Sequence, residues 1–250
     1  MKEKIAKLIK GIGSQFFSAL IKSRRPDAIQ KFDEEEIENS YQHFKKYFPT
    51  SLLFRDASSQ DREAELIRGF AIKNALAHTD KNGIYLEFGV DIGNSINFFG
   101  RMLAGHGKEI FGFDAFRGLS EDWAGTFTEA SHFDRGGNPP VVEKNVKLLI
   151  GWVEDTLPSF LENHKNEKIN FAHLDMDTYT PTKFTLRLIK PYLNDGAILL
   201  FDELYNYSGW REGEFKALME EFEEQEIKYL AFSTATKVVI KYKKNKLKRE

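Results

Sequence analysis

Carboxylate side chains gather at the ends of two apolar runs in the second half of the chain. Asp175 and Asp177 follow the run that ends at Leu174, and Asp202 and Glu203 follow the next run. If these runs are neighbouring parallel strands, about 4.8 Å apart, the acids converge at one edge of a sheet. So many carboxylates repel one another, and oxygen ligands without cysteine favour Mg²⁺ or a similar divalent cation among them.

Purely structural interpretations of these residues stay open. Asp177 can cap a helix that begins near Thr180, and Glu203 can be solvated. His173, inside the first run, is better explained as a hydrogen-bonded structural residue than as a ligand. A cation that binds a hydroxyl group lowers its pKa and holds it in line with a methyl donor, so the cluster is also compatible with group transfer.

A second candidate site lies in I-Y-L-E-F-G-V-D-I-G-N-S, residues 84–95. The apolar start has the composition of a buried parallel strand, and Gly89 and Gly93 allow positive φ and close backbone approach. We expect these glycines to cradle the amino-acid part of a sulfonium cofactor, with Glu87 favouring its positive charge. The spacing is not G-x-G-x-x-G, so pyrophosphate binding is poorly supported.

Two further positions could contact a nucleoside. Asp114 ends the next expected strand, 25 residues after Gly89. A carboxylate at this position can accept hydrogen bonds from both hydroxyl groups of a ribose. NAD-binding folds use the same device, and the residue could instead cap a helix or form a turn. After the third strand, G-W-V-E-D-T-L-P offers Trp152 for stacking on adenine. The alternatives are that Asp155 only caps the next helix and that Trp152 lies in the core.

The elements that must position these residues alternate along the chain from residue 84 onward. Short apolar runs and amphipathic helical stretches predict a parallel sheet covered on both faces. We expect strands at 84–89, 109–114, 147–151, 169–175, 196–202, 227–233 and 236–243, and helices at 93–105, 155–165, 180–192 and 211–225. Too few residues join the last two strands for a crossover, so they must pair antiparallel. The expected fold is therefore a doubly wound, Rossmann-like α/β fold whose seven-stranded sheet has one reversed strand. By analogy, this is the arrangement of class I S-adenosylmethionine (SAM) methyltransferases.

Composition limits the class of protein. A chain of 250 residues with 41% hydrophobic content can bury one good core, which predicts a helical extension at 1–50 and one domain at 51–250. The net charge of −2 argues against a general nucleic-acid binder. The absence of cysteine excludes thiol catalysis and disulfides. No apolar run approaches the roughly 20 residues of a membrane span, so a cytoplasmic location is expected.

Residues 1–25 hold seven Lys or Arg and one Glu, with apolar residues at helical spacing. This pattern predicts a basic amphipathic helix, which we expect to dock on its own domain or on a dimer mate in a homo-oligomer. Contact with an anionic membrane surface or a partner's groove is the alternative. An acidic helix at 32–41 and a helix at 62–78 follow, and a basic stretch at 241–249 is expected to be a solvated tail.

The connection at 116–142 is longer than a compact fold needs, which is typical of a lid or a disordered insertion. Its aromatic residues, with His132 and Arg135, would suit a sugar-like or glycosylated small-molecule acceptor. His132 is therefore a candidate base, although a lone loop histidine is more often a surface residue. Closure of such a loop would exclude water from a methyl transfer.

Five segments, in order, resemble the macrocin O-methyltransferase (TylF-type) family of metal-dependent, SAM-using sugar and natural-product O-methyltransferases: L-E-F-G-V-D-I-G-N-S, F-G-F-D-A-F-R-G-L-S-E-D-W, G-W-V-E-D-T-L-P, H-L-D-M-D-T-Y and F-D-E-L. The resemblance covers about residues 54–229. It implies a cofactor site formed by Glu87, Gly89, Gly93, Ser95, Asp114, Gly151, Trp152, Glu154 and Asp155. It also implies a metal site at Asp175, Asp202 and Glu203, with Asp175 as the general base. The family commonly has two successive aspartates where this chain has Asp202 and Glu203.

Two rival functions come from other classes. An NAD-dependent oxidoreductase is disfavoured because the pyrophosphate fingerprint G-x-G-x-x-G is missing. A non-catalytic SAM-binding or scaffold protein would need no acids beside the cofactor. The acids at 175, 202 and 203 argue mildly against it.

Overall fold

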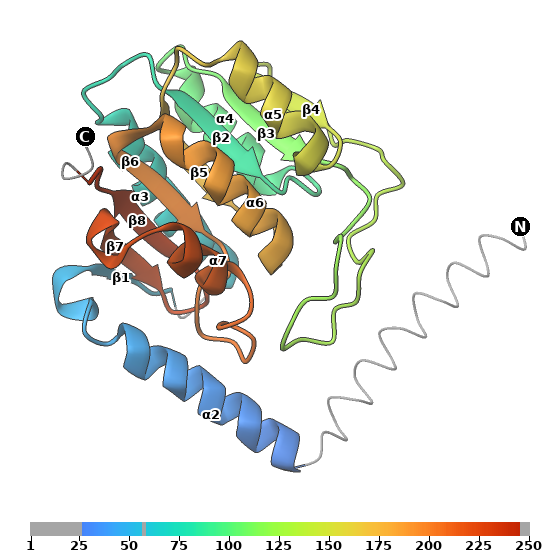
Figure 1. Ribbon diagram of the computed structural model, residues 1–250, viewed down its shortest axis with the longest axis vertical. Coiled ribbons are helices and arrows are strands. Elements are labelled where there is room, and N and C mark those ends of the chain that lie inside the picture. The colour runs from blue at the N-terminus through green and yellow to red at the C-terminus, as the bar shows by residue number, and fades with distance from the viewer. Residues whose placement is uncertain (1–26, 57–58, 246–250) are drawn as a thin grey trace, which may run out of the picture.

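The computed structural model describes residues 27–56 and 59–245 (Figure 1). Eight strands form one sheet in the order β1-β7-β8-β6-β5-β2-β3-β4. The strands are β1 (Leu52–Phe54), β2 (Ile84–Phe88), β3 (Ile110–Asp114), β4 (Val146–Ile150), β5 (Ile169–Leu174), β6 (Leu193–Phe201), β7 (Ile227–Ser233) and β8 (Val238–Tyr242). The α-helices are α2 (Asp27–Phe44), α3 (Gln60–Leu76), α4 (Asn94–Ala104), α5 (Val153–Asn163), α6 (Tyr179–Ile189) and α7 (Glu214–Glu221).

The strand order reverses between β2 and β5. On one side β2 pairs with β3, and β3 with β4; on the other side β2 pairs with β5, and β5 with β6, all in parallel. β8 is antiparallel to both β6 and β7, which confirms the predicted reversal. Open sheets bind ligands outside the carboxyl ends of the strands where the order reverses. A ligand site is therefore expected beside the residues that follow β2 and β5.

The sequence predicts seven strands, and the structure corrects this number to eight. The additional strand, β1, pairs in parallel with β7 at the edge of the sheet. It has three residues, and Leu52 and Leu53 are 53% and 59% exposed. A short, exposed edge strand lacks the buried apolar run that marks the other strands, so no strand was expected between the helices predicted at 32–41 and 62–78.

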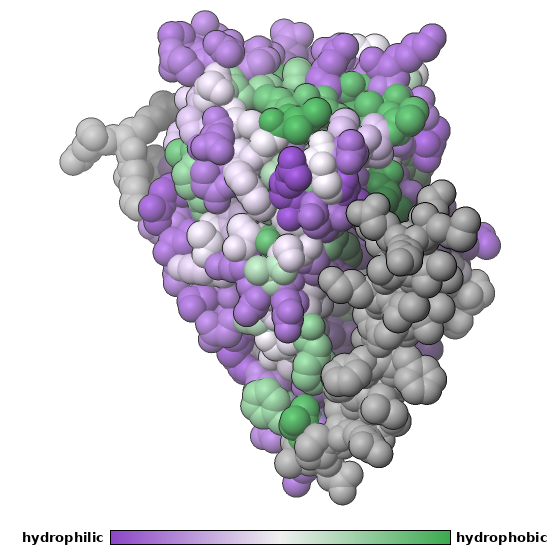
Figure 2. All heavy atoms as spheres, turned by 90° about the vertical axis from the view of Figure 1, so that its right-hand side faces the viewer, coloured by the Kyte–Doolittle hydropathy of each residue, from purple (hydrophilic) through white to green (hydrophobic). Residues whose placement is uncertain are grey.

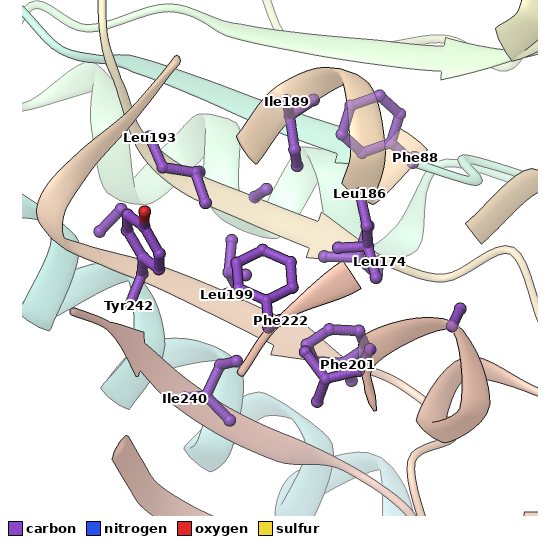
Figure 3. Packing of buried hydrophobic residues seen from close by; sticks show 14 of the residues in the cluster. Phe88, Leu174, Leu186, Ile189, Leu193, Leu199, Phe201, Phe222, Ile240 and Tyr242 are labelled. Carbon is purple, nitrogen blue, oxygen red and sulfur yellow. The ribbon is translucent and has the colours of Figure 1, made fainter. Parts of the chain in front are cut away.

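Helices cover both faces of the sheet. α3 and α4 pack on one face, and α5, α6 and α7 pack on the other (Figure 1). Figure 3 shows the second of these layers, in which Phe88, Leu174 and Phe201 of the sheet pack with Leu186 and Ile189 of α6. β2 and β5 are buried along their whole length. Two covered faces explain why these strands appear as continuous apolar runs rather than as alternating patterns.

Helix α2 precedes the sheet and is attached to it near its C-terminal end. Phe44 is fully buried, and its ring centroid lies 5.9 Å from that of Trp210 and 5.4 Å from that of Tyr205. The backbone N–H of Asn206 donates to Ser40 Oγ at 3.0 Å. The predicted boundary near residue 50 stays a prediction.

The predicted basic helix at 1–25 lies outside the described residues, as does the end of the basic tail. In the part of the chain that the structure describes, no helix combines the length and the apolar character of a membrane span.

Glu63 ties α3 to two distant loops and lies in the wall of the cavity described below. Its carboxylate accepts hydrogen bonds from the N–H of Asp56 (3.0 Å), from the N–H and Oγ1 of Thr234 (2.6 and 2.8 Å) and from the N–H of Ala235 (3.1 Å). Burial alone would raise the pKa of Glu63, but these hydrogen bonds outweigh it and lower the pKa. The ionised carboxylate therefore stabilises the fold.

Replacing this residue in Glu63→Gln should lower the free energy of unfolding by roughly 1–3 kcal/mol at neutral pH, because hydrogen bonds to a charged acceptor are lost. The folded-state pKa is depressed, so the contribution is complete above the unfolded pKa of about 4.3 and is lost as the pH falls through the folded value. Urea unfolding across this range measures the difference. Glu65→Gln, at an exposed position of the same helix, is the control; a difference that stays constant with pH would contradict the assignment.

Candidate active site

A cavity of about 780 Å³ opens at the carboxyl edge of the sheet. Residues that follow β2, β3, β4, β5 and β6 form its wall, together with parts of the long loop 116–142. Pockets for small molecules commonly measure roughly 300–1,000 Å³. Figure 2 shows the side of the molecule at the right of Figure 1, where hydrophilic side chains surround hydrophobic patches. Ile92, Phe133 and Trp152 line the cavity and are exposed, so its mouth is partly apolar.

Backbone conformations that L residues rarely adopt concentrate around this cavity. Six of the described residues other than glycine have a positive φ. Five of these six line the cavity: Asp91, Phe116, Phe133, Asp177 and Asn206. Such conformations cost free energy and persist where the surrounding structure requires them, typically at functional sites.

The glycine turn after β2 brings the backbone close to that of β5. Gly89 has a φ of +87°, and its N–H donates to the carbonyl of Phe113 at 3.0 Å. A Cβ at Gly89 would lie 1.7 Å from the backbone oxygen of Asp175, so only glycine fits. Gly89 and Ser95 line the cavity. Gly93, with a φ of +84°, is the N-cap residue of α4 and lies outside the cavity wall.

Asp114 lines the cavity at the end of β3 and holds the glycine turn in place. Its Oδ2 accepts from the N–H groups of Val90 (2.7 Å) and Asp91 (2.9 Å), and its Oδ1 accepts from that of Phe116 (2.6 Å). A carboxylate has about four acceptor positions. The turn interpretation is therefore correct, and in this conformation one acceptor position is left for a ligand hydroxyl rather than the two expected for a ribose.

The segment after β4 forms the opposite wall. The N–H of Gly151 donates to the carbonyl of Asp114 at 3.0 Å, and Gly151, Trp152 and Glu154 line the cavity. Trp152 is 39% exposed, so its placement in the core is excluded. Asp155 lies in the first turn of α5 and outside the wall.

Glu87 lies beneath the cavity rather than in its wall. The residue is fully buried, and its Oε1 accepts a hydrogen bond from Ser95 Oγ at 2.5 Å. His173 Nδ1 lies 3.8 Å from the same oxygen. Ser95 thus donates to the buried carboxylate from within the protein, and Glu87, expected to favour the positive charge of the cofactor, can support a ligand through Ser95.

Three of the acids form a compact group that opens into the cavity. Asp175, Asp177 and Glu203 each offer an oxygen, and these oxygens lie within 4.8 Å of one another. Glu203 Oε2 is buried without a hydrogen-bond partner. Burial and repulsion from Asp202 raise the pKa of Asp175 and of Glu203 well above their usual ranges, and raise the pKa of Asp177 to about 7. Converging, underpaired oxygen atoms fit a divalent cation.

Asp202 faces cations instead. Its Oδ2 lies 2.7 Å from Lys237 Nζ, and its Oδ1 lies 3.4 Å from Arg68 Nη2 and 3.3 Å from His173 Nε2. Burial would raise the pKa of Asp202, but Lys237, His173 and Arg68 hold it well below the usual range. Burial would likewise lower the pKa of His173, but Asp202, Glu87 and Asp175 raise it to about 9.

The structure corrects two alternative interpretations of the acids. Asp177 does not cap α6: Thr178 is the N-cap residue and makes no side-chain cap. Instead Glu121 of the long loop accepts from the N–H of Thr180 at 2.8 Å and from its hydroxyl at 2.7 Å. Glu203 is only partly solvated, since the residue is half-buried and its Oε2 is fully buried. His173 is a buried hydrogen-bonded residue, as predicted.

The long loop folds against the cavity. Arg135 Nε lies 2.5 Å from Asp91 Oδ1, which joins the loop to the glycine turn. Trp123, Phe133 and Arg135 line the cavity. His132 is exposed outside the wall, with its ring against that of Phe133 at 4.4 Å between centroids. This position does not support His132 as a base and agrees with the surface interpretation.

Arg68, Asp91 and Lys237 are the residues of this site that the sequence did not single out. Arg68 lies on α3, more than 100 residues before Asp202, and Lys237 lies after a turn between the last two strands. A charged residue next to the apolar run of β8 was the only signal for Lys237. For Arg68 no local pattern distinguishes a buried arginine from an exposed one.

Comparison with known proteins gives this geometry a chemical class. Residues 86–204 match a methyltransferase domain. The chain is similar in structure to CalS11, a calicheamicin methyltransferase, with a TM-score of 0.62, 22% identity and coverage of 89% of both chains. The apo form of CalS11, described as a TDP-rhamnose 3'-O-methyltransferase, gives 0.56 at 22% identity, covering 91% of this chain and 92% of that one. The O-methyltransferase NovP gives 0.52 at 17% identity, covering 72% and 80%. No curated protein matches the sequence.

The match to a methyltransferase domain lies inside the segment in which the resemblance was expected. The α/β methyltransferase fold is confirmed. At these levels of identity the structural similarity shows the fold alone.

Proposed function

We propose that the protein transfers a methyl group from SAM to a hydroxyl group of a sugar or of a glycosylated or other natural-product small molecule. The observation that carries this proposal is that the glycine turn after β2 and the acid group after β5 and β6 open into one cavity. The methyltransferase domain supports the reaction class.

The residues on the donor side would bind and orient SAM, which supplies an activated methyl group when bound. Gly89 allows close approach to the backbone, and Asp114 keeps an acceptor position free beside it. Trp152 presents an exposed ring for stacking on adenine. Much of the rate would come from holding the two reactants in line.

On the acceptor side, Asp175 would take the proton of the hydroxyl group. Its carboxylate lines the cavity beside Asp177 and Glu203, so it lies where a hydroxyl group of a bound acceptor can reach it. The acid group Asp175, Asp177 and Glu203 is the part of the cluster that fits Mg²⁺ or a similar cation. A divalent cation in such a site lowers the pKa of a bound hydroxyl group.

The acceptor class rests on the lining and on the resemblance to TylF-type enzymes. Trp123 and Phe133 supply rings and Arg135 supplies a guanidinium group at the cavity, which suits a sugar-like molecule with apolar faces and hydroxyl groups. The sugar nucleotide in the description of CalS11 supports the same class.

Calorimetric titration with SAM, with its demethylated product and with NAD tests the proposal. We expect SAM and its product to bind and NAD not to bind. Transfer of labelled methyl groups to hydroxylated acceptors, with and without a chelator, then separates an enzyme from a binding module. Binding of NAD alone would reject the proposal in favour of an oxidoreductase, and SAM binding without turnover on any acceptor would favour the scaffold.

The variant Asp114→Ala should weaken SAM binding by roughly ten- to a hundredfold, because a ligand hydrogen bond to a charged acceptor and the two hydrogen bonds that hold the glycine turn are lost together. Calorimetry measures the change. Asp155→Ala removes a carboxylate outside the cavity wall and should bind SAM as the wild type does. Equal affinities for the two variants would show that neither the carboxylate of Asp114 nor the turn that it holds contributes to SAM binding.

A further inference from the structure

The acids at the carboxyl edge of the sheet differ in their partners, and Asp175 is shared, since it offers an oxygen both to the group with Asp177 and Glu203 and to a group with His173 and Asp202. Both oxygens of Asp202 lie beside protein cations, and the shortest contact is the 2.7 Å ion pair with Lys237. The side chains of Asp202, Lys237 and Arg68 are only 8%, 12% and 17% exposed. In contrast, Glu203 Oε2 is buried without a hydrogen-bond partner, and one oxygen of Glu203 lies within 4.8 Å of oxygens of Asp175 and Asp177.

The turn between β7 and β8 holds Lys237 in this position. Thr236 Oγ1 donates to the carbonyl of Asp202 at 2.6 Å, and the N–H of Lys237 donates to Ser233 Oγ at 3.0 Å. These contacts fix the backbone on both sides of the ion pair. The ammonium group is thus placed against Asp202 by the fold rather than by a flexible surface side chain.

We propose that Lys237 divides the acid cluster: it keeps Asp202 in an internal ion pair and leaves Asp175, Asp177 and Glu203 as the carboxylates that bind a divalent cation. This inference rests on the proposed function and changes the expected ligand set, because Asp177 takes the place of Asp202. Lys237 is accordingly a positioning residue, which acts on the cation through Asp202.

The charges make the proposal testable. Removing Lys237 alone takes away the shortest cation contact of Asp202 and leaves it with Arg68 and His173, so the region becomes more negative by one charge and attracts a cation more strongly. Removing Asp202 alone leaves an unpaired ammonium group, which repels one. Removing both leaves the net charge unchanged, so the double variant separates a ligand role of Asp202 from its role as the partner of Lys237.

Calorimetric titration of Mn²⁺ into the full-length protein carries the test. We expect Lys237→Met to bind Mn²⁺ roughly tenfold more tightly or better, since one opposing charge within a few ångströms is gone. Asp202→Asn should bind more weakly, and the double variant Asp202→Asn with Lys237→Met should lie within about threefold of the wild type. Glu203→Gln should lose at least tenfold, because a ligand charge is removed. Lys228→Met, at an exposed position of β7, is the control.

The double variant removes both charges of the Asp202–Lys237 pair but leaves Arg68 and His173 without the Asp202 carboxylate, so Lys237→Met, which keeps Asp202 with these two partners, keeps the test valid if the double variant fails to fold. Circular dichroism checks the fold of each sample. A double variant that loses affinity as strongly as Glu203→Gln would show that Asp202 is a ligand and would overturn the proposal. Absence of Mn²⁺ binding in every variant would also overturn it, and SAM titration of the same samples shows whether the methyl-donor site is intact.

Discussion

The variant Asp175→Asn is expected to reduce kcat for methyl transfer by roughly 10²–10⁴-fold, the usual contribution of a positioned general base. Asparagine keeps the volume of the side chain but cannot take the proton of an acceptor hydroxyl group. It also removes one charge from the group formed with Asp177 and Glu203. Asp175 follows β5, whereas Asp114 ends β3 and Trp152 follows β4. Because these donor-side residues are unchanged, the affinity for SAM should stay close to that of the wild type.

Single-turnover assays, combined with calorimetry, measure both quantities on the same protein. The control Asp155→Asn removes a carboxylate that lies outside the cavity wall. A normal kcat in Asp175→Asn would remove this residue from the mechanism, and a parallel loss of SAM affinity would indicate a structural rather than a chemical role.

The variant Gly89→Ala should destabilise the protein by roughly 3 kcal/mol or more and should abolish SAM binding. Two effects combine, since the methyl group would lie 1.7 Å from the backbone oxygen of Asp175 and the residue has a φ of +87°. Overpacking and an unfavourable φ each cost roughly 1–3 kcal/mol. Relief of the clash requires the ends of β2 and β5 to move apart, and this movement deforms both the donor site and the acid group.

Gly107 provides a matched control, because it also has a positive φ, +63°, but a Cβ there would meet nothing within 4 Å. Gly107→Ala therefore carries the conformational cost without the close contact. Thermal unfolding and SAM titration of the two variants separate these effects. Equal stability of the two variants, with normal SAM binding, would contradict the close approach between Gly89 and the backbone of Asp175.

Local patterns were sufficient to predict most of the sheet. The buried strands β2 and β5 are apolar on both faces, so their positions were visible as continuous runs, and the short join between β7 and β8 required an antiparallel pair. β1 was missed because Leu52 and Leu53 lie on an exposed edge, where no apolar periodicity is needed.

The candidate site was predictable where its residues adjoin strand ends and was not predictable where it depends on distant partners. Gly89, Asp114 and Asp175 could be placed from the sequence because each directly follows an apolar run. The pairing of Asp202 with Lys237 and Arg68 could not, because it joins three segments that meet only in the folded chain. In the long loop, the sequence could not show which side chains face the cavity, so His132, which lies outside the wall, was a candidate base.

The most direct test of the account is a crystal structure of the protein grown with the demethylated product of SAM and with Mn²⁺, with anomalous scattering used to locate the cation. The account predicts the product against Gly89, Asp114 and Trp152, and an anomalous peak beside Asp175 and Glu203 in the same cavity. A cavity that holds neither, or that takes up a dinucleotide in their place, would contradict it.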